Sequence, residues 1–471
     1  MGTKKITAFE VKVGVGKKFA FSLGELAQNL SNGLVCVFFL MFCTEVAGLN
    51  AGVVGTLLLV GRFWDMINDT WVGSWTDRTR TKLGRYRPWL LWFNVPLFVS
   101  TILLFWAHPT WSIQAMTVWV IILYFVWCFM YTCVNIPHTA LVAVMTQDGA
   151  ERASIAGWKM MFTNIGTIFG SAATVPIVAR IGGENAVRGW LGTVTLYSVI
   201  GMILLFVCVK VCKEVITPKS DQEKMPILKG VVLAVKNKYY LILLLGAFIL
   251  GMLNLGRATS QTYLFMYVVG NMNMMSVYAI VTGIGGMIGA FSLPFFSNLL
   301  KSKGKVICYS SFIGAVLLLI QYLCSNSLNA GFWITGFLSY ICFWLALAGT
   351  ISATGDAAEY ALLSTGVRQE GLYGAYWSFM HKAGIAIGSA EVGWMLAATG
   401  YTANVPQQPM EVINGIKMIY FVLPIILSVV VAVIFIFYKI DYKKYDEILE
   451  EQKARGLIAC EEKYRRIVDD I

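Results

Sequence analysis

The chain has 471 residues, of which 57% are hydrophobic and only 13% are charged, and its mean hydropathy is +0.67. Soluble globular proteins are far less apolar, so these values exclude that class and indicate a polytopic membrane protein. The formal charge of +11 does not indicate nucleic acid as a partner, because Lys and Arg lie mostly in short gaps between apolar segments. The cysteines are scattered without a CxxC pair, so we expect neither a disulfide framework nor a cysteine metal site.

Apolar segments long enough to span a bilayer, which takes about 20 residues, recur along the chain. The longest polar interruption, residues 213–237, has six such segments on each side. The sequence therefore predicts an all-α membrane protein with two six-helix halves, 1–212 and 238–440, a central cytoplasmic loop at 213–237 and a cytoplasmic tail at 441–471. The twelve predicted transmembrane helices lie near 21–47, 51–76, 88–107, 113–142, 153–179, 190–212, 238–269, 273–299, 304–323, 330–358, 370–398 and 411–439.

Charge asymmetry between the loops predicts the orientation. The N-terminal lysines, the loops at 77–89 and 301–305, and the tail fall on one side of the predicted membrane. Loops of the opposite parity are largely free of Lys and Arg, with an exception at Arg180 and Arg188. Both termini are therefore expected to be cytoplasmic. The N-terminus has no pattern of a removable signal peptide, so we expect insertion by the transmembrane helices themselves.

The stretch Arg62-Phe-Trp-Asp65-Met-Ile-Asn68-Asp69 places two carboxylates inside the second predicted span. Asp65 and Asp69 are four residues apart, so they share one helix face, with Asn68 beside them. Ionisable groups inside a membrane are costly and usually mark an ion pathway. Paired buried carboxylates need a compensating cation, and oxygen ligands suit a hard one. We predict a site for Na⁺, Li⁺ or H⁺, with Thr132 as a further ligand; the alternative is a structural ion pair between Arg62 and Asp65.

Other charged residues suggest charge balance and gating. Lys382, in the eleventh predicted span, is interpreted as the counter-charge to the aspartates when the cation is absent; the alternative is snorkelling to the membrane interface. Charged groups at the ends of the second and tenth spans suit a latch between helix ends. For the loop after the second span, the alternative is a role in orientation only. The predicted gating residues are Asp77, Arg78, Arg85, Asp356, Glu359 and Arg368.

Several further polar and aromatic residues within the spans suggest a substrate-binding lining. Sugars and glycosides are bound by convergent amide, carboxylate and cationic groups together with aromatic faces. Aromatic residues of membrane helices more often serve packing or interface anchoring, which is the alternative for each of them. The candidates are Asn29, Asn135, His138, Lys159, Arg257, Tyr373 and Trp377.

The motifs together resemble the glycoside-pentoside-hexuronide:cation symporter family of the major facilitator superfamily, which includes the melibiose and glucuronide carriers. The resemblance covers nearly the whole chain. Its motifs are Arg62-Phe-Trp-Asp65 with Asn68-Asp69, Gly84-Arg-Tyr-Arg-Pro-Trp89, Tyr131-Thr-Cys-Val-Asn135-Ile-Pro137, Gly355-Asp-Ala-Ala-Glu-Tyr360 and Gly366-Val-Arg-Gln-Glu-Gly371. It implies that Asp65, Asp69, Asn68 and Thr132 bind the coupling cation and that Lys382 balances their charge.

Departures from the melibiose carrier concern the sugar. Asn29 and Asn135 stand where that carrier has two sugar-binding acids, so melibiose is not the expected substrate. Lys159 and Arg257 make an anionic sugar such as a glucuronide attractive, alongside a neutral glycoside. The resemblance implies a monomeric carrier in the bacterial cytoplasmic membrane whose partners are a small sugar or glycoside, a coupling cation (Na⁺ or H⁺) and lipid. No organic cofactor is expected.

Other functions are weighed against symport. A lysolipid or other amphiphile carrier has the same fold, and a non-transporting membrane sensor is a further alternative. A membrane-embedded transferase needs a catalytic cluster in a large polar loop, and the loops here are too short for one. The sequence therefore predicts a transporter and no enzyme.

Overall fold

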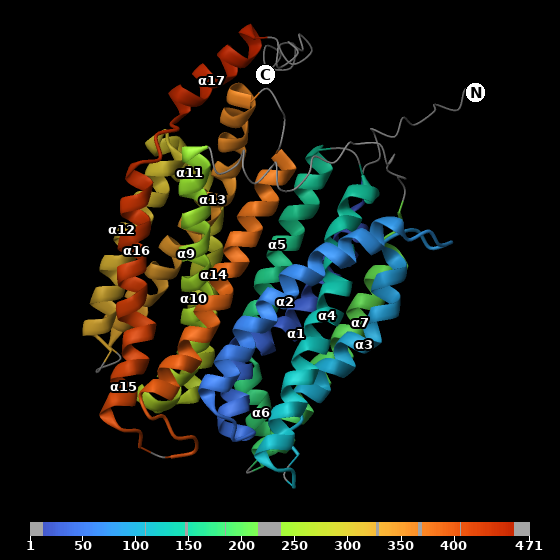
Figure 1. The fold of residues 1–471 in the computed structure, drawn as a ribbon, viewed down its shortest axis with the longest axis vertical. Coiled ribbons are helices and arrows are strands. Elements are labelled where there is room, and N and C mark those ends of the chain that lie inside the picture. The colour runs from blue at the N-terminus through green and yellow to red at the C-terminus, as the bar shows by residue number, and fades with distance from the viewer. Residues whose placement is uncertain are drawn as a thin grey trace.

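The computed structural model describes residues 13–108, 110–146, 149–183, 185–214, 237–325, 329–365, 370–405 and 407–455. These residues are almost entirely helical, and among them the only extended pairing is an isolated bridge between Thr81 and Gly84. Long helices run side by side along the molecule, with the first half of the chain beside the second (Figure 1). The predicted central loop lies almost wholly outside the described residues.

The helices follow the chain in order. The first half contains α1 (Val15–Met41), its π-helical continuation η2 (Phe42–Val46), α2 (Ala51–Arg78), α3 (Arg87–Leu104), α4 (Ile113–Met145), α5 (Gly149–Ala172), α6 (Thr174–Gly182) and α7 (Ala186–Val211). The second half contains α9 (Lys238–Tyr263), η3 (Leu264–Val268), α10 (Met272–Phe291), α11 (Leu293–Leu300), α12 (Lys303–Leu323), α13 (Ala330–Thr365), α14 (Glu370–Ala398), α15 (Met410–Lys417), η4 (Met418–Val422) and α16 (Leu423–Ile436). Helix α17 (Tyr442–Ala454) follows in the tail.

Helical segments overlap all of the predicted spans, so the all-α membrane fold is confirmed. Within the described residues, nine helices are long and apolar enough to cross a membrane, and the pair α5 and α6, bent by 40°, makes a tenth. Helices α2 and α14 do not reach that apolarity, and they are the helices that carry Asp65, Asp69 and Lys382. The exact number of twelve spans therefore stays a prediction.

The start of α2 is fixed by local sequence. Gly48 adopts a φ of 67°, a left-handed conformation that glycine tolerates without steric cost. Asn50 then caps the helix, because its side-chain oxygen accepts hydrogen bonds from the backbone N–H groups of Gly52 at 2.9 Å and Val53 at 3.2 Å. This turn and cap set the point from which α2 carries its acidic residues.

Helix α14 packs closely against both halves through small residues. A Cβ atom on Gly393 would lie 2.5 Å from the carbonyl oxygen of Ala51 and 2.8 Å from the Cα atom of Gly55, so α14 and α2 approach backbone to backbone. On the α9 side, a Cβ atom on Gly388 would lie 2.3 Å from the carbonyl oxygen of Met252. Such close helix contacts are typical of small-residue faces in membrane proteins. They hold Lys382 of α14 against the acidic face of α2.

Candidate cation and substrate sites

The predicted cation-binding residues lie together in the structure. Asp65 is 6% exposed, and the hydroxyl of Thr132 on α4 donates to its Oδ1 atom at 2.8 Å. Lys382 donates to Oδ2 of Asp69, and its Nζ atom lies 3.9 Å from Oδ2 of Asp65. Asn68, which lies between the two aspartates in the sequence, is fully buried. Residues predicted from three different spans therefore form one polar cluster across the two halves.

Asn68 is the unusual member of this cluster. Neither its amide nitrogen nor its amide oxygen has a hydrogen-bond partner in the described part of the chain, although both atoms are buried. A buried polar group without a partner costs roughly 1–3 kcal/mol. Such a group beside two carboxylates is suited to coordinate a bound ion.

The alternative ion pair between Arg62 and Asp65 is not formed. Among the described residues, no contact within 4.0 Å joins the two charges, and Nη2 of Arg62 donates instead to the sulfur of Cys36 at 3.1 Å. The counter-charge of the aspartates is the ammonium group of Lys382.

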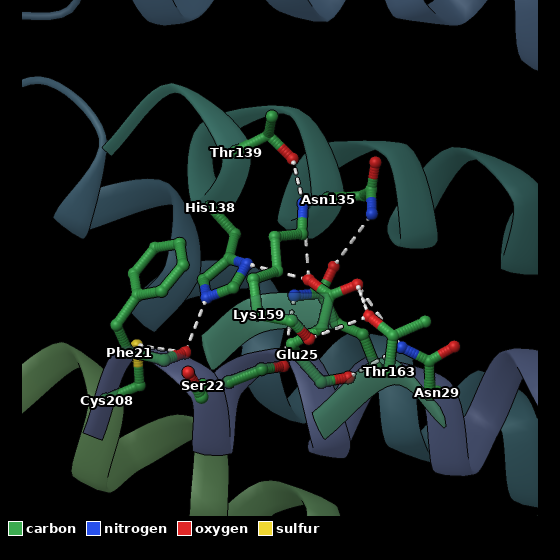
Figure 2. A network of polar contacts seen from close by, with 12 residues as sticks. Phe21, Ser22, Glu25, Asn29, Asn135, His138, Thr139, Lys159, Thr163 and Cys208 are labelled. Carbon is green, nitrogen blue, oxygen red and sulfur yellow. Dashed lines mark hydrogen bonds and ion pairs between the residues drawn. The ribbon is translucent and has the colours of Figure 1, made fainter. Parts of the chain in front are cut away.

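A second polar cluster surrounds Glu25 on α1 (Figure 2). Its carboxylate lies 3.4 Å from Nζ of Lys159 and 3.5 Å from Nδ1 of His138. Thr163 donates to it at 3.1 Å, and the amide of Asn29 donates at 3.3 Å. The sequence reasoning missed Glu25, although its place four residues before Asn29 on one helix face was visible. A buried carboxylate therefore lies one helical turn before Asn29.

The remaining contacts of this cluster tie it to the protein. Lys159 donates to the hydroxyl of Thr139 at 3.1 Å, and Asn135 donates to Oε1 of Gln28 at 3.2 Å. The His138 ring stacks on Phe21 with centroids 4.3 Å apart, and its Nε2 atom lies 3.0 Å from the carbonyl oxygen of Phe21. His138 is therefore held firmly between helices α1 and α4.

The other predicted lining residues lie elsewhere, in the second half. Arg257 is buried with its guanidinium 4.4 Å from the ring centroid of Tyr340 and 5.4 Å from that of Tyr420. Tyr373 and Trp377 belong to the buried core of that half; the Tyr373 ring packs 4.0 Å from the ring of Tyr240. The structure thus divides the predicted lining among separate places.

A cavity of about 110 Å³ lies between the halves, lined from α1 and α5 on one side and from α9, α10 and α13 on the other. Its polar lining includes Asn164, Asn254 and Gln261, and its aromatic lining is Tyr340 and Trp344. None of these residues was predicted as lining. Isolated amides in apolar segments give a weak signal, and only the packing of five helices brings them together.

Contacts are described for three of the predicted gating residues. Asp356 pairs with Lys303 at 2.7 Å. The backbone N–H of Arg85 donates to Glu214 at 2.8 Å, which ties the basic loop to the end of α7. The carbonyl oxygen of Glu359 accepts from Gln452 of α17 at 2.7 Å, and Arg78 is exposed. The side chain of Asp77 and the whole of Arg368 lie outside the described residues.

The two halves are joined by hydrogen bonds around Glu45 in η2. Its carboxylate accepts hydrogen bonds from the hydroxyls of Tyr267 and Tyr401, and from the backbone N–H of Asn404 at 3.0 Å. The hydroxyls of Thr44 and Tyr263 lie 2.8 Å apart beside it. The segment between α14 and α15, which contains Tyr401, lies at the end of the molecule opposite α17 (Figure 1). We call these contacts the Glu45 latch, because they join the two halves at that end.

A model of the MFS/sugar transport protein family matches residues 20–442. The chain belongs to this family. Similar members include the isoprimeverose transporter of Lactiplantibacillus pentosus, 30% identical over 90% of this chain and 88% of that protein. A glucuronide carrier protein homologue of Escherichia coli strain K12 is 28% identical over 92% of this chain and 94% of its own. An uncharacterised symporter of Bacillus subtilis strain 168 is 29% identical over 95% of this chain and 96% of its own.

Solved structures of other transporters share the fold. A bacterial homologue of the human lysosomal transporter Spinster, in an inward-facing and occupied conformation, has a TM-score of 0.65 at 12% identity, over 92% of this chain and 96% of its own. A bacterial homologue of human drug peptide transporters has a TM-score of 0.63 at 14% identity, over 95% of this chain and 100% of its own.

Membership in the family confirms the resemblance to glycoside-pentoside-hexuronide:cation symporters that the motifs predicted. The protein is a multi-pass membrane transporter of the major facilitator superfamily. A membrane-embedded transferase is therefore excluded, as expected from the short loops.

Proposed function

We propose that this carrier couples the uptake of a sugar or glycoside to Na⁺ by alternating access. The observation that carries the proposal is the ammonium of Lys382, which is shared by Asp65 and Asp69 beside the partnerless amide of Asn68. The names of similar proteins, an isoprimeverose transporter and a glucuronide carrier homologue, support a sugar as substrate. The carrier works in the bacterial cytoplasmic membrane with both termini in the cytoplasm.

In the cation-free state the ammonium of Lys382 offsets one of the two carboxylate charges. A Na⁺ ion would take its place, with oxygen ligands from Asp65, Asp69, Asn68 and Thr132. Proton coupling needs only a titratable carboxylate, whereas a metal ion requires several oxygens, so the buried free oxygen of Asn68 favours Na⁺ over H⁺.

The exchange of cations also changes the contact between the halves. Asp65 and Asp69 belong to α2 and Lys382 to α14, so displacement of the ammonium removes an ion pair that joins the halves. The cation thereby favours a different arrangement of α2 and α14, and substrate and cation raise one another's affinity by the same factor. Because one chain supplies both partners, the monomer contains the complete cation site.

The polar lining of the cavity between the halves supports a sugar over an amphiphile. A lipid chain bound there would desolvate the side chains of Asn164, Asn254 and Gln261 and offer them no hydrogen bond, whereas the hydroxyls of a sugar would bond to them.

Uptake into proteoliposomes tests the coupling. Purified carrier is given a panel of labelled glycosides under an inward Na⁺ gradient, under an inward H⁺ gradient with choline in place of Na⁺, and without a gradient. We expect accumulation with the Na⁺ gradient. Accumulation with the H⁺ gradient alone would replace Na⁺ by H⁺ in the proposal, and equal uptake in all three conditions would refute coupled transport.

A further inference from the structure

We infer that the cavity between the halves binds a neutral glycoside, through the amides of Asn254 and Gln261 and the ring of Trp344, and that the carrier discriminates against hexuronides. The inference rests on the proposed transport function and adds the chemical class of its substrate. It differs from the anionic sugar that Lys159 and Arg257 suggested in the sequence.

The cavity offers hydrogen-bonding groups that the protein itself leaves available. The half-buried side chain of Asn254 makes no hydrogen bond to any described residue. Oε1 of Gln261 accepts from the hydroxyl of Tyr340 at 3.3 Å, and its amide nitrogen remains able to donate. An amide provides both donors and acceptors, which matches sugar hydroxyls that are themselves both.

An aromatic face stands beside these amides. Trp344 of α13 lies against α10 at Gly286, where a Cβ atom would come within 2.7 Å of the indole nitrogen. The absence of a side chain at Gly286 therefore lets the indole lie close to the α10 backbone. A fixed indole can pack against the apolar C–H face of a pyranose ring while the amides bind its hydroxyls.

The charge of the cavity argues against a carboxylate substrate. Among the described residues that line it, none is Asp, Glu, Lys or Arg. A desolvated carboxylate needs a cationic partner to offset its lost hydration. A hexuronide bound here would therefore pay this cost without compensation.

Neither of the two cations predicted for an anionic sugar, Lys159 and Arg257, lines this cavity. Lys159 lies 3.4 Å from the carboxylate of Glu25 (Figure 2). Arg257 lines a separate cavity of about 20 Å³, and its guanidinium lies 4.4 Å from the ring centroid of Tyr340. Binding a hexuronide at Lys159 would first require breaking its ion pair with Glu25, whereas a neutral glycoside requires no such change.

Matched substrates test the inference. Counterflow in proteoliposomes is measured for 4-nitrophenyl β-glucoside, β-galactoside, β-xyloside and β-glucuronide, each with Na⁺ and with choline. We expect at least one neutral glycoside to exchange at least tenfold faster than the glucuronide. Faster exchange of the glucuronide would overturn the inference and leave the proposed function intact. Exchange of neutral glycosides without any dependence on Na⁺ would overturn the proposed coupling alone, and no exchange of any sugar would overturn both.

Two variants locate the site. Asn254→Ala is expected to raise the KM of the preferred glycoside about tenfold, which corresponds to about 1.4 kcal/mol. Asn273 carries an exposed amide at the start of α10, so Asn273→Ala is the matched control and should leave KM unchanged. The Na⁺-induced rise in melting temperature, which reports on the other site, shows that each variant is folded. An unchanged KM in folded Asn254→Ala would overturn the assignment of the cavity.

Discussion

Lys382 of α14 donates directly to the carboxylate of Asp69 on α2, so a cation of the second half occupies the acidic site of the first. The same ammonium lies 3.9 Å from Asp65. One residue therefore both offsets one of the two negative charges of the acidic site and ties the halves together. Any cation that replaces it alters both properties at once, which is the physical requirement for coupling ion binding to a conformational change.

Removing this ammonium is expected to leave the two carboxylates without a counter-charge. In Lys382→Met, Asp65 and Asp69 lose their counter-charge, so the cation-free carrier becomes less stable while Na⁺ gains an uncontested site. We predict a lower melting temperature without Na⁺ and an apparent Na⁺ affinity about tenfold tighter, or about 1.4 kcal/mol. Lys443→Met, on the exposed face of α17, is the control. Equal Na⁺ affinity in Lys382→Met and wild type would show that the ammonium does not compete with the ion.

The amide of Asn68 distinguishes Na⁺ from H⁺. If its oxygen is a ligand, Asn68→Ala weakens Na⁺ binding about tenfold and leaves the protein folded, since the amide makes no bond to the described residues. The measurement is the Na⁺ concentration for half-maximal uptake of a transported glycoside. Unchanged Na⁺ dependence would argue that the carboxylates alone bind the coupling ion, as for a proton.

The Glu45 latch is expected to hold the end opposite α17 closed. Burial raises the pKa of the Tyr401 phenol above its ordinary value, so it stays a hydrogen-bond donor at neutral pH. Tyr401→Phe removes one of several donors to Glu45, and we predict a loss of about 1 kcal/mol, or about a fivefold shift toward the open end.

Spin labels at Ala186 and Met410, exposed positions of the two halves at that end, measure this shift in a cysteine-free background. The matched control is Tyr309→Phe, whose side chain is 50% exposed on α12. A distance distribution in Tyr401→Phe identical to that of the control would contradict a latch.

The close approach of α2 and α14 predicts a strong difference between two glycines of the same helix. A methyl group on Gly393 meets backbone atoms of Ala51 and Gly55, which cannot yield without separating the helices. Gly393→Ala should therefore cost about 1–3 kcal/mol and lower the melting temperature by several degrees. A Cβ atom on Gly374 would have no neighbouring heavy atom within 4 Å. Gly374→Ala should therefore leave the melting temperature unchanged or raise it. Equal effects of the two substitutions would show that the contact is not tight.

The features of this structure that can be predicted from sequence are those that depend on local residue patterns. Apolar length predicted where helices lie, and the four-residue spacing of Asp65 and Asp69 predicted a shared face, because helix geometry alone fixes both. The partner of these acids, Lys382, followed from charge balance inside a membrane, although it lies more than three hundred positions away in the chain.

The parts that sequence missed depend on packing between distant helices. In the sequence, Glu25 is an acid near the start of an apolar segment with nothing to distinguish it. Its role in a polar cluster becomes visible only in the fold, where α4 and α5 place His138 and Lys159 beside it. Asn254 reads as an ordinary polar residue until five helices enclose a cavity around it. Tyr373 carries the same aromatic signal as a sugar-binding ring, yet it packs in the core. Residue type alone does not distinguish these environments.

The most direct test of the cation site is the effect of Na⁺ on the melting temperature of purified carrier and of its Asp69→Asn variant, at constant ionic strength with choline as the replacement ion. Ligand that binds only the folded state stabilises it by about 2.7 kcal/mol at a hundred times its Kd. We predict a saturable rise with Na⁺ in the wild type, no rise in Asp69→Asn, and a normal rise in the exposed control Asp446→Asn. A Na⁺-dependent rise of wild-type size in Asp69→Asn would show that Asp69 does not bind the ion.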